Sequence, residues 1–116
     1  MWLTGNLQIW LYSTPTDMRK SIDGLSIIVA EQLEKNPCGP DVFVFHNRKQ
    51  DKLKVLYYDK NGFCLWYKRL EKGRFLLPKM PANSYALTIE QLRWLLDGLR
   101  IEDLRGNPRL SFDTYY

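Results

Sequence analysis

The chain has 116 residues, of which 45% are hydrophobic and 14% aromatic, and its formal net charge is +4. This composition predicts one folded domain with a modest core and excludes a chain that is disordered throughout. No apolar run approaches the ~20 residues that a membrane span needs, and no leader-like segment opens the chain. We therefore expect a cytoplasmic protein. One histidine and two cysteines without CxxC spacing predict no metal site and no disulfide framework.

The first half of the chain predicts a strand, a long helix and a second strand. Apolar residues at 8–12 indicate the first strand, which Pro15 ends. Thr16 is positioned to cap a helix. Apolar residues at spacings of three and four give that helix one buried face: Met18, Ile22, Leu25, Val29 and Leu33. A Pro- and Gly-rich stretch at 36–40 ends the helix, and the apolar residues 42–46 indicate the second strand.

The second half predicts a hairpin and a short final helix. Residues 53–58 and 63–69 alternate in polarity, and the Asn61-Gly62 pair between them supplies the positive φ angles of a tight turn. Residues 75–77 are expected to form an edge strand. Thr88 and Gln91 form a capping box ahead of an apolar helical stripe. The predicted fold is α+β: a small antiparallel sheet of about four to five strands, with one long helix and a shorter C-terminal helix.

Positive charge is concentrated in residues 48–74. Nine bases less three acids gives this segment +6, whereas the rest of the chain carries −2. Cations interleaved with aromatic rings suit a polyanion with stackable bases, so nucleic acid is the first partner to consider. The predicted nucleic-acid-binding residues are Arg48, Lys49, Lys52, Lys54, Tyr58, Trp66, Lys68, Arg69, Lys72 and Arg74. The alternative is an ordinary solvated sheet face with lysines that protect an edge strand.

The expected start of the long helix offers a second, weaker anion site. Thr16, Arg19 and Lys20 lie where helix N–H groups and two cations can seat a phosphate. The ordinary interpretation is that Thr16 is only a cap and that Asp17 satisfies the same N–H groups. We favour the cap.

Several blocks of sequence, in order, resemble one known family. They are Pro15-Thr16-Asp17-Met18-Arg19-Lys20 with Asp23-Gly24-Leu25, Val42-Phe43-Val44-Phe45 with Asn47-Arg48, the stretch 54–75, and Leu87-Thr88 with Gln91-Leu92 and Leu95-Leu96-Asp97-Gly98. The chain is similar over about residues 7 to 99 to the TnpB-type (Orf2-like) accessory proteins of the insertion sequence sixty-six (IS66) family. Ser21-Ile22 departs from the Gly-Phe that is common there. We expect residues 1–100 to form the domain and 101–116 to be a loosely ordered tail.

This resemblance implies an accessory protein for DNA transposition, with the transposase and DNA as partners and no cofactor. Our leading hypothesis is a non-catalytic protein that binds DNA through the basic segment and assists the transposase. One alternative is an adaptor that contacts the transposase without touching DNA, using its tryptophans as hot spots. A second alternative is a metal-dependent nuclease. This alternative is weak because the aspartates are scattered and His46 is the only histidine. Oligomeric state is left open.

Overall fold

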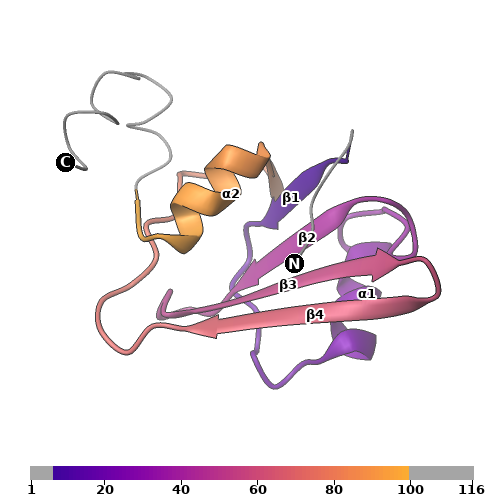
Figure 1. The fold of residues 1–116 in the computed structure, drawn as a ribbon, viewed down its shortest axis with the longest axis horizontal. Helices are drawn as coiled ribbons and strands as arrows, with labels where there is room; N and C mark the ends of the chain where they lie inside the picture. The colour runs from indigo at the N-terminus through magenta and orange to yellow at the C-terminus, as the bar shows by residue number, and fades with distance from the viewer. Residues whose placement is uncertain (1–6, 100–116) are drawn as a thin grey trace.

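The fold was analysed in a computed structural model, which describes residues 7–99. Five strands and two helices follow one another in the order β1, α1, β2, β3, β4, β5, α2 (Figure 1). Their bounds are β1 Ile9–Tyr12, α1 Ile22–Glu31, β2 Val42–His46, β3 Lys52–Asp59, β4 Gly62–Arg69, β5 Ser84–Leu87 and α2 Ile89–Leu96. The predicted α+β class is confirmed. The predicted tail, and residues 1–6 and 100 of the predicted domain, lie outside the described residues.

All five strands form one sheet in the order β4-β3-β2-β1-β5. The pairs β2–β3, β3–β4 and β1–β5 are antiparallel, but β1 and β2 are parallel. The sheet is therefore mixed rather than wholly antiparallel, because α1 connects two parallel neighbours as a crossover. Both strands consequently end at the same edge of the sheet, and the loops that follow them start side by side.

Each face of the sheet is covered by a separate apolar layer. On one face α1 packs through Leu25 and Val29 against Phe43, Phe45 and Leu56. On the other, α2 and the segment around Phe75 cover a second cluster: Ile9, Leu11, Val42, Val44, Leu53, Val55, Phe75, Leu87, Leu92 and Leu95. Alternation along β3 explains both, because neighbouring residues point to opposite faces. The strand β4 forms one edge of the sheet.

The long helix is shorter than the sequence predicts. It begins at Ile22 with Ser21 as its N-cap, and Thr16 is not a cap. Thr16 is instead buried, and its hydroxyl donates to the carbonyl of Thr14. Residues 17–20 form a separate turn in which the Asp17 carboxylate accepts the Arg19 N–H at 2.9 Å. Asp favours such local hydrogen bonds over helix, so it is this turn that precludes an earlier helix start.

The hairpin between β3 and β4 is where the sequence predicts it, but its turn is built differently. Asp59 pairs with Gly62, so the two turn residues are Lys60 and Asn61. The positive φ belongs to Lys60, at 53°, and not to Asn61 or Gly62. The predicted location was therefore right, and the predicted source of the positive φ was wrong. Register, fixed by apolar residues on two buried faces, outweighed the local Asn-Gly preference.

The fifth strand is not the predicted one. Residues 75–77 contain no strand, and β5 is instead Ser84–Leu87, paired with β1. Phe75 is fully buried, and its backbone N–H donates to the Gln50 carbonyl at 2.7 Å. The apolar character that suggested a strand at 75–77 thus reflects burial over the sheet.

The helix α2 has well-defined ends. The predicted capping box is confirmed, since Thr88 and Gln91 each accept the other's backbone N–H. At the other end Gly98 has φ 82°, and Leu99 N–H donates to the Trp94 carbonyl at 2.9 Å. With Gly98 N–H bonded to Leu95, these contacts make a Schellman motif.

Candidate nucleic-acid interface

Two loops meet where the parallel strands β1 and β2 end. The backbone N–H of Thr16 donates to the His46 carbonyl at 2.8 Å. The buried His46 ring adds a second link, because its Nε2 lies 3.1 Å from the Ser13 carbonyl oxygen. His46 thus ends a strand as predicted. Its contacts hold the loop after β1 beside the turn that contains Asn47.

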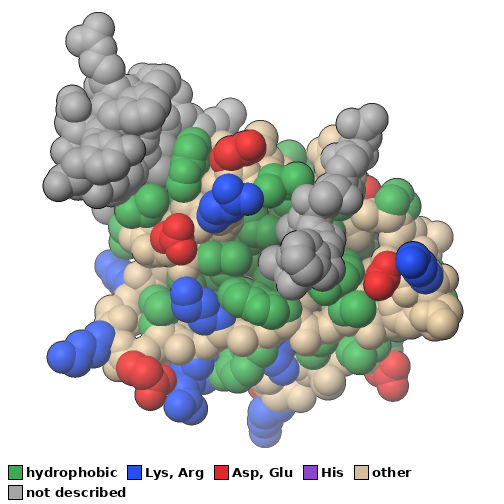
Figure 2. Space-filling view, in the orientation of Figure 1, with side chains coloured by type: hydrophobic (Ala, Val, Ile, Leu, Met, Phe, Trp, Pro, Cys, Tyr) green, Lys and Arg blue, Asp and Glu red, His purple; other side chains and the backbone are tan. Residues whose placement is uncertain are grey.

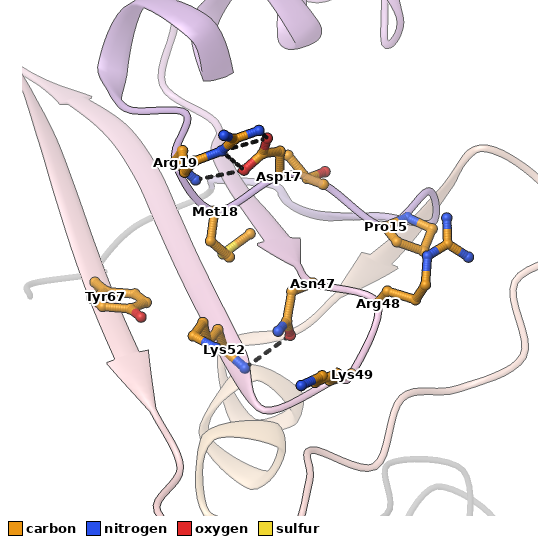
Figure 3. Close-up of a pocket in the computed structure, with 10 residues that line it drawn as sticks. Pro15, Asp17, Met18, Arg19, Asn47, Arg48, Lys49, Lys52 and Tyr67 are labelled. Atoms are coloured by element: carbon orange, nitrogen blue, oxygen red, sulfur yellow. Dashed lines mark hydrogen bonds and ion pairs between the residues drawn. The ribbon is translucent and has the colours of Figure 1, made fainter.

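A groove of about 620 Å³ lies between these loops. We call it the basic groove; it is lined by Pro15, Thr16, Asp17, Met18, Arg19, Asn47, Arg48, Lys49, Lys52 and Tyr67. Figure 3 shows Arg19 with Asp17 on one side, Lys49 and Lys52 on the other, and Tyr67 projecting from β4. Four cations and one acid line the groove, so its field favours an anion.

The acid of the basic groove is neutralised by its neighbour. The guanidinium of Arg19 contacts the Asp17 carboxylate through Nε and Nη2, with Nη2 at 2.6 Å. This hydrogen bonding is the main reason that the pKa of the Asp17 carboxyl falls from 3.8 to about 2. Both side chains are exposed. Asp17 is therefore charged at neutral pH, and its charge is balanced locally by Arg19.

The turn between β2 and β3 is held by Asn47 and Asp51. The Asn47 amide donates to the Asp51 carboxylate at 2.6 Å, and its Oδ1 accepts the N–H groups of Asp51 and Lys52. The hydrogen bond from Asn47 is the main cause that lowers the pKa of Asp51. The Lys52 ammonium lies 3.5 Å from the same carboxylate. This network fixes the turn whose exposed residues, Arg48 and Lys49, face the groove.

Two of the predicted ligands have structural partners instead. The Lys54 ammonium donates to the carbonyls of Met18 and Lys20, at 2.7 and 2.8 Å. The Lys68 ammonium donates to the Leu96 carbonyl at 2.8 Å, at the C-terminus of α2. A cation there complements the helix dipole. These contacts lie on opposite faces of the β3–β4 pair, so the basic segment is not one surface.

The aromatic residues are also distributed differently from the prediction. Tyr58 makes an edge-to-face contact with Phe63, with ring centroids 5.0 Å apart. Trp66 is half-buried against the core cluster on the α2 side. The ring that lines the groove is Tyr67, which is 48% exposed and was not among the predicted ligands. The available signal was the alternation along residues 63–69, which places Tyr67 on the other face from Trp66 and beside Lys54 of the paired strand.

Four predicted ligands have exposed side chains without a hydrogen bond or ion pair to another residue in 7–99: Arg48, Lys49, Lys72 and Arg74. Arg69 is exposed too, but its Nε lies 3.0 Å from the Glu71 carboxylate. Residues 70–75 fold back on the β2–β3 turn, because Leu70 N–H donates to the Asp51 carbonyl at 2.8 Å. Figure 2 shows Lys and Arg side chains gathered where β3 begins and β4 ends.

The predicted phosphate site at Thr16, Arg19 and Lys20 is not at a helix start, because α1 begins only at Ile22. Thr16 is buried away from α1, and the Lys20 carbonyl accepts from Lys54. Arg19 nevertheless lines the groove, so anion binding by Arg19 stays a prediction. Within the described part of the chain, no group of three or more His, Cys, Asp or Glu residues could hold a metal ion.

None of the helices in residues 7–99 is long and apolar enough to cross a membrane.

The structure is thus a five-stranded α+β domain with a basic groove at the end of the sheet where β1 and β2 terminate. Comparison with known proteins then places it: residues 7–106 match the model of the IS66 Orf2-like family, and the chain belongs to that family. The family implies an accessory role in transposition. The protein y4hO of Sinorhizobium fredii is 38% identical over 94 residues, covering 81% of this chain and 82% of that protein. The protein y4jC of the same organism is 32% identical over 102 residues, covering 88% of this chain and 87% of that protein. Both are described as uncharacterized. No solved structure matches the chain.

Proposed function

We propose that this protein is a non-catalytic transposition factor that binds DNA of its element through the basic groove and the adjoining loop 70–75, and so assists the transposase. The carrying observation is that Arg48, Lys49, Lys72 and Arg74 lie exposed at one end of the sheet without partners among residues 7–99. Exposed cations that no acid neutralises gain most from a phosphate backbone, because each contact releases a condensed counterion.

The relevant surface is smaller than the whole 48–74 segment. Lys54 and Lys68 are bound to backbone carbonyls, and Trp66 contributes to the core. The loop that follows β1 adds Arg19 to this surface, and the turn that follows β2 contributes the exposed Arg48 and Lys49. The interface that we propose therefore joins three separate stretches of sequence at one sheet edge.

The experiment is a binding titration of the purified chain with terminal-repeat DNA. The test variant is Arg48→Gln with Lys49→Gln, which removes two exposed charges from the groove. The control is Lys60→Gln, which removes one exposed charge from the turn at the opposite end of β3 and β4. We expect the test variant to lose at least tenfold in affinity and the control to change little. Absence of wild-type binding at low salt would overturn the proposal.

The described tryptophans of the adaptor alternative, Trp10, Trp66 and Trp94, do not all lie on one face of the sheet. Trp10 packs on the α1 side, where its Nε1 donates to Asp41 at 3.0 Å, whereas Trp66 packs on the α2 side. Trp10 and Trp66 therefore cannot form one contact patch. No DNA binding in the titration, together with co-purification with the transposase in a separate experiment, would be the signature of an adaptor.

A further inference from the structure

We propose that the ligand of the basic groove is an unpaired DNA strand, with Tyr67 as the platform on which one base stacks. This inference rests on the proposed function and adds the form of DNA that is recognised. It separates this protein from readers of intact duplex.

The position of Tyr67 supports this inference first. It lies on the edge strand β4, on the same face as α1, and its side chain is 48% exposed. The residue paired with it is Lys54, and the next pair along that face joins Lys52 to Arg69. Lys54, Lys52 and Arg69 therefore lie on the same face of the β3–β4 pair as the ring. Base–aromatic stacking beside backbone-binding cations is how single strands are bound.

The ring also has a fixed cation beside it before any ligand arrives. The Lys54 ammonium lies 5.4 Å from the Tyr67 ring centroid, while it is anchored to the Met18 and Lys20 carbonyls. A strand-borne ring beside a fixed cation loses little freedom on binding, which favours affinity. Arg48, Lys49 and Lys52, from the β2–β3 turn and the start of β3, provide the phosphate-binding side of the groove.

The helices argue against duplex reading. An α-helix that reads base edges in the major groove presents cations and amides to the DNA. The exposed residues of α1 include Asp23, Ile27 and Glu31, with no Lys or Arg anywhere in the helix. In α2 Arg93 is the only base beside Glu90. Neither described helix therefore offers a surface suited to a major groove.

The dimensions of the groove agree with a nucleotide. Its volume of about 620 Å³ lies within the range of roughly 300–1,000 Å³ that is usual for ligand pockets. Such a groove accommodates a base with its phosphate, but a double helix could only lie across it. Met18 adds a second apolar side chain to the lining of the groove.

The test compares a 12-nucleotide single strand from the terminal repeat with the duplex of the same sequence, by fluorescence anisotropy with the full chain. We expect tighter binding of the single strand. Tyr67→Ala should weaken single-strand binding roughly tenfold or more, whereas Tyr67→Trp should retain it. The matched control is Ile27→Ala, which removes another exposed apolar side chain, 57% exposed, from the acidic face of α1. Thermal melting would show that all variants fold.

The outcomes distinguish this inference from the proposed function. Duplex binding as tight as single-strand binding, with no effect of Tyr67→Ala, would overturn the inference and leave the proposed function standing. No binding of either DNA at low salt would overturn both. Equal losses in Tyr67→Ala and Ile27→Ala would also overturn the inference, because they would show a general effect of surface truncation.

Discussion

The ammonium of Lys54, near the start of β3, donates to the carbonyl of Met18 at 2.7 Å and so ties the sheet to the loop that precedes α1. A second bond to the Lys20 carbonyl, at 2.8 Å, closes the same contact. Charge in the basic segment therefore serves two purposes. Some cations hold the loops that form the groove, and others are exposed for a ligand.

Replacing Lys54 with methionine tests the first purpose. The Met18 and Lys20 carbonyls would lose their donor, and because these bonds are part-buried and exposed, their net contribution is about 0.5–1.5 kcal/mol. We expect the free energy of unfolding to fall by about that amount. We also expect faster hydrogen exchange of the Lys20 amide, whose bond to the Asp17 carbonyl lies in the same turn. Unchanged exchange at Lys20 would show that Lys54 does not hold the turn.

Lys68 is expected to act on stability rather than on DNA. Lys68→Met removes the bond to the Leu96 carbonyl and the charge at a helix C-terminus, so urea unfolding should show a loss of about 1–2 kcal/mol. The control Lys72→Met changes an exposed residue and should stay within about 0.5 kcal/mol. A Lys68 variant with full stability but weakened DNA binding would contradict this assignment.

Replacing two glycines with alanine should affect the stability of the protein to different extents. Gly98 has φ 82°, so Gly98→Ala should destabilise the protein by roughly 1–2 kcal/mol through backbone strain. Gly62 has no positive φ, and a Cβ there meets no atom within 4 Å. Gly62→Ala should therefore be tolerated, and thermal unfolding of both variants provides the comparison. A large loss in Gly62→Ala would indicate that the hairpin needs glycine there after all.

The pH dependence of the Asp17–Arg19 pair follows from the pKa of Asp17. Because that pKa is lowered from 3.8 to about 2 in the folded protein, the pair stabilises the fold fully above pH 3.8. This contribution is lost as the pH falls through about 2. NMR titration of the Asp17 carboxyl should give a midpoint near 2, and Arg19→Gln should move it toward 3.8. A wild-type midpoint already near 3.8 would show that the pair does not form.

The strands β1 to β4 and the second helix were predictable because their signals are local, whereas β5 was expected at 75–77 and lies at Ser84–Leu87. Alternation in β3 and β4, and the capping box at Thr88, need no knowledge of distant residues. The start of α1 was not predictable in this way. Asp17 forms the preceding turn locally, but the residue that ties this turn to the sheet is Lys54, which is 36 positions from Met18 in sequence.

The candidate site was predictable only in part for the same reason. Charge counting found Arg48 and Lys49, which line the groove, but it could not separate them from Lys68, which caps a helix. The parallel pairing of β1 with β2 joins the two loops, and no local pattern announced it. Tyr67 was overlooked because its exposure depends on β4 being an edge strand.

The most direct test of DNA binding through the basic groove is the salt dependence of affinity. For single-stranded DNA, the slope of log affinity against log salt should be less steep by about 1.4 in the Arg48→Gln, Lys49→Gln double variant, about 0.7 per lost phosphate contact. Lys60→Gln should leave the slope unchanged. A double variant whose slope equals that of the wild type would contradict the account.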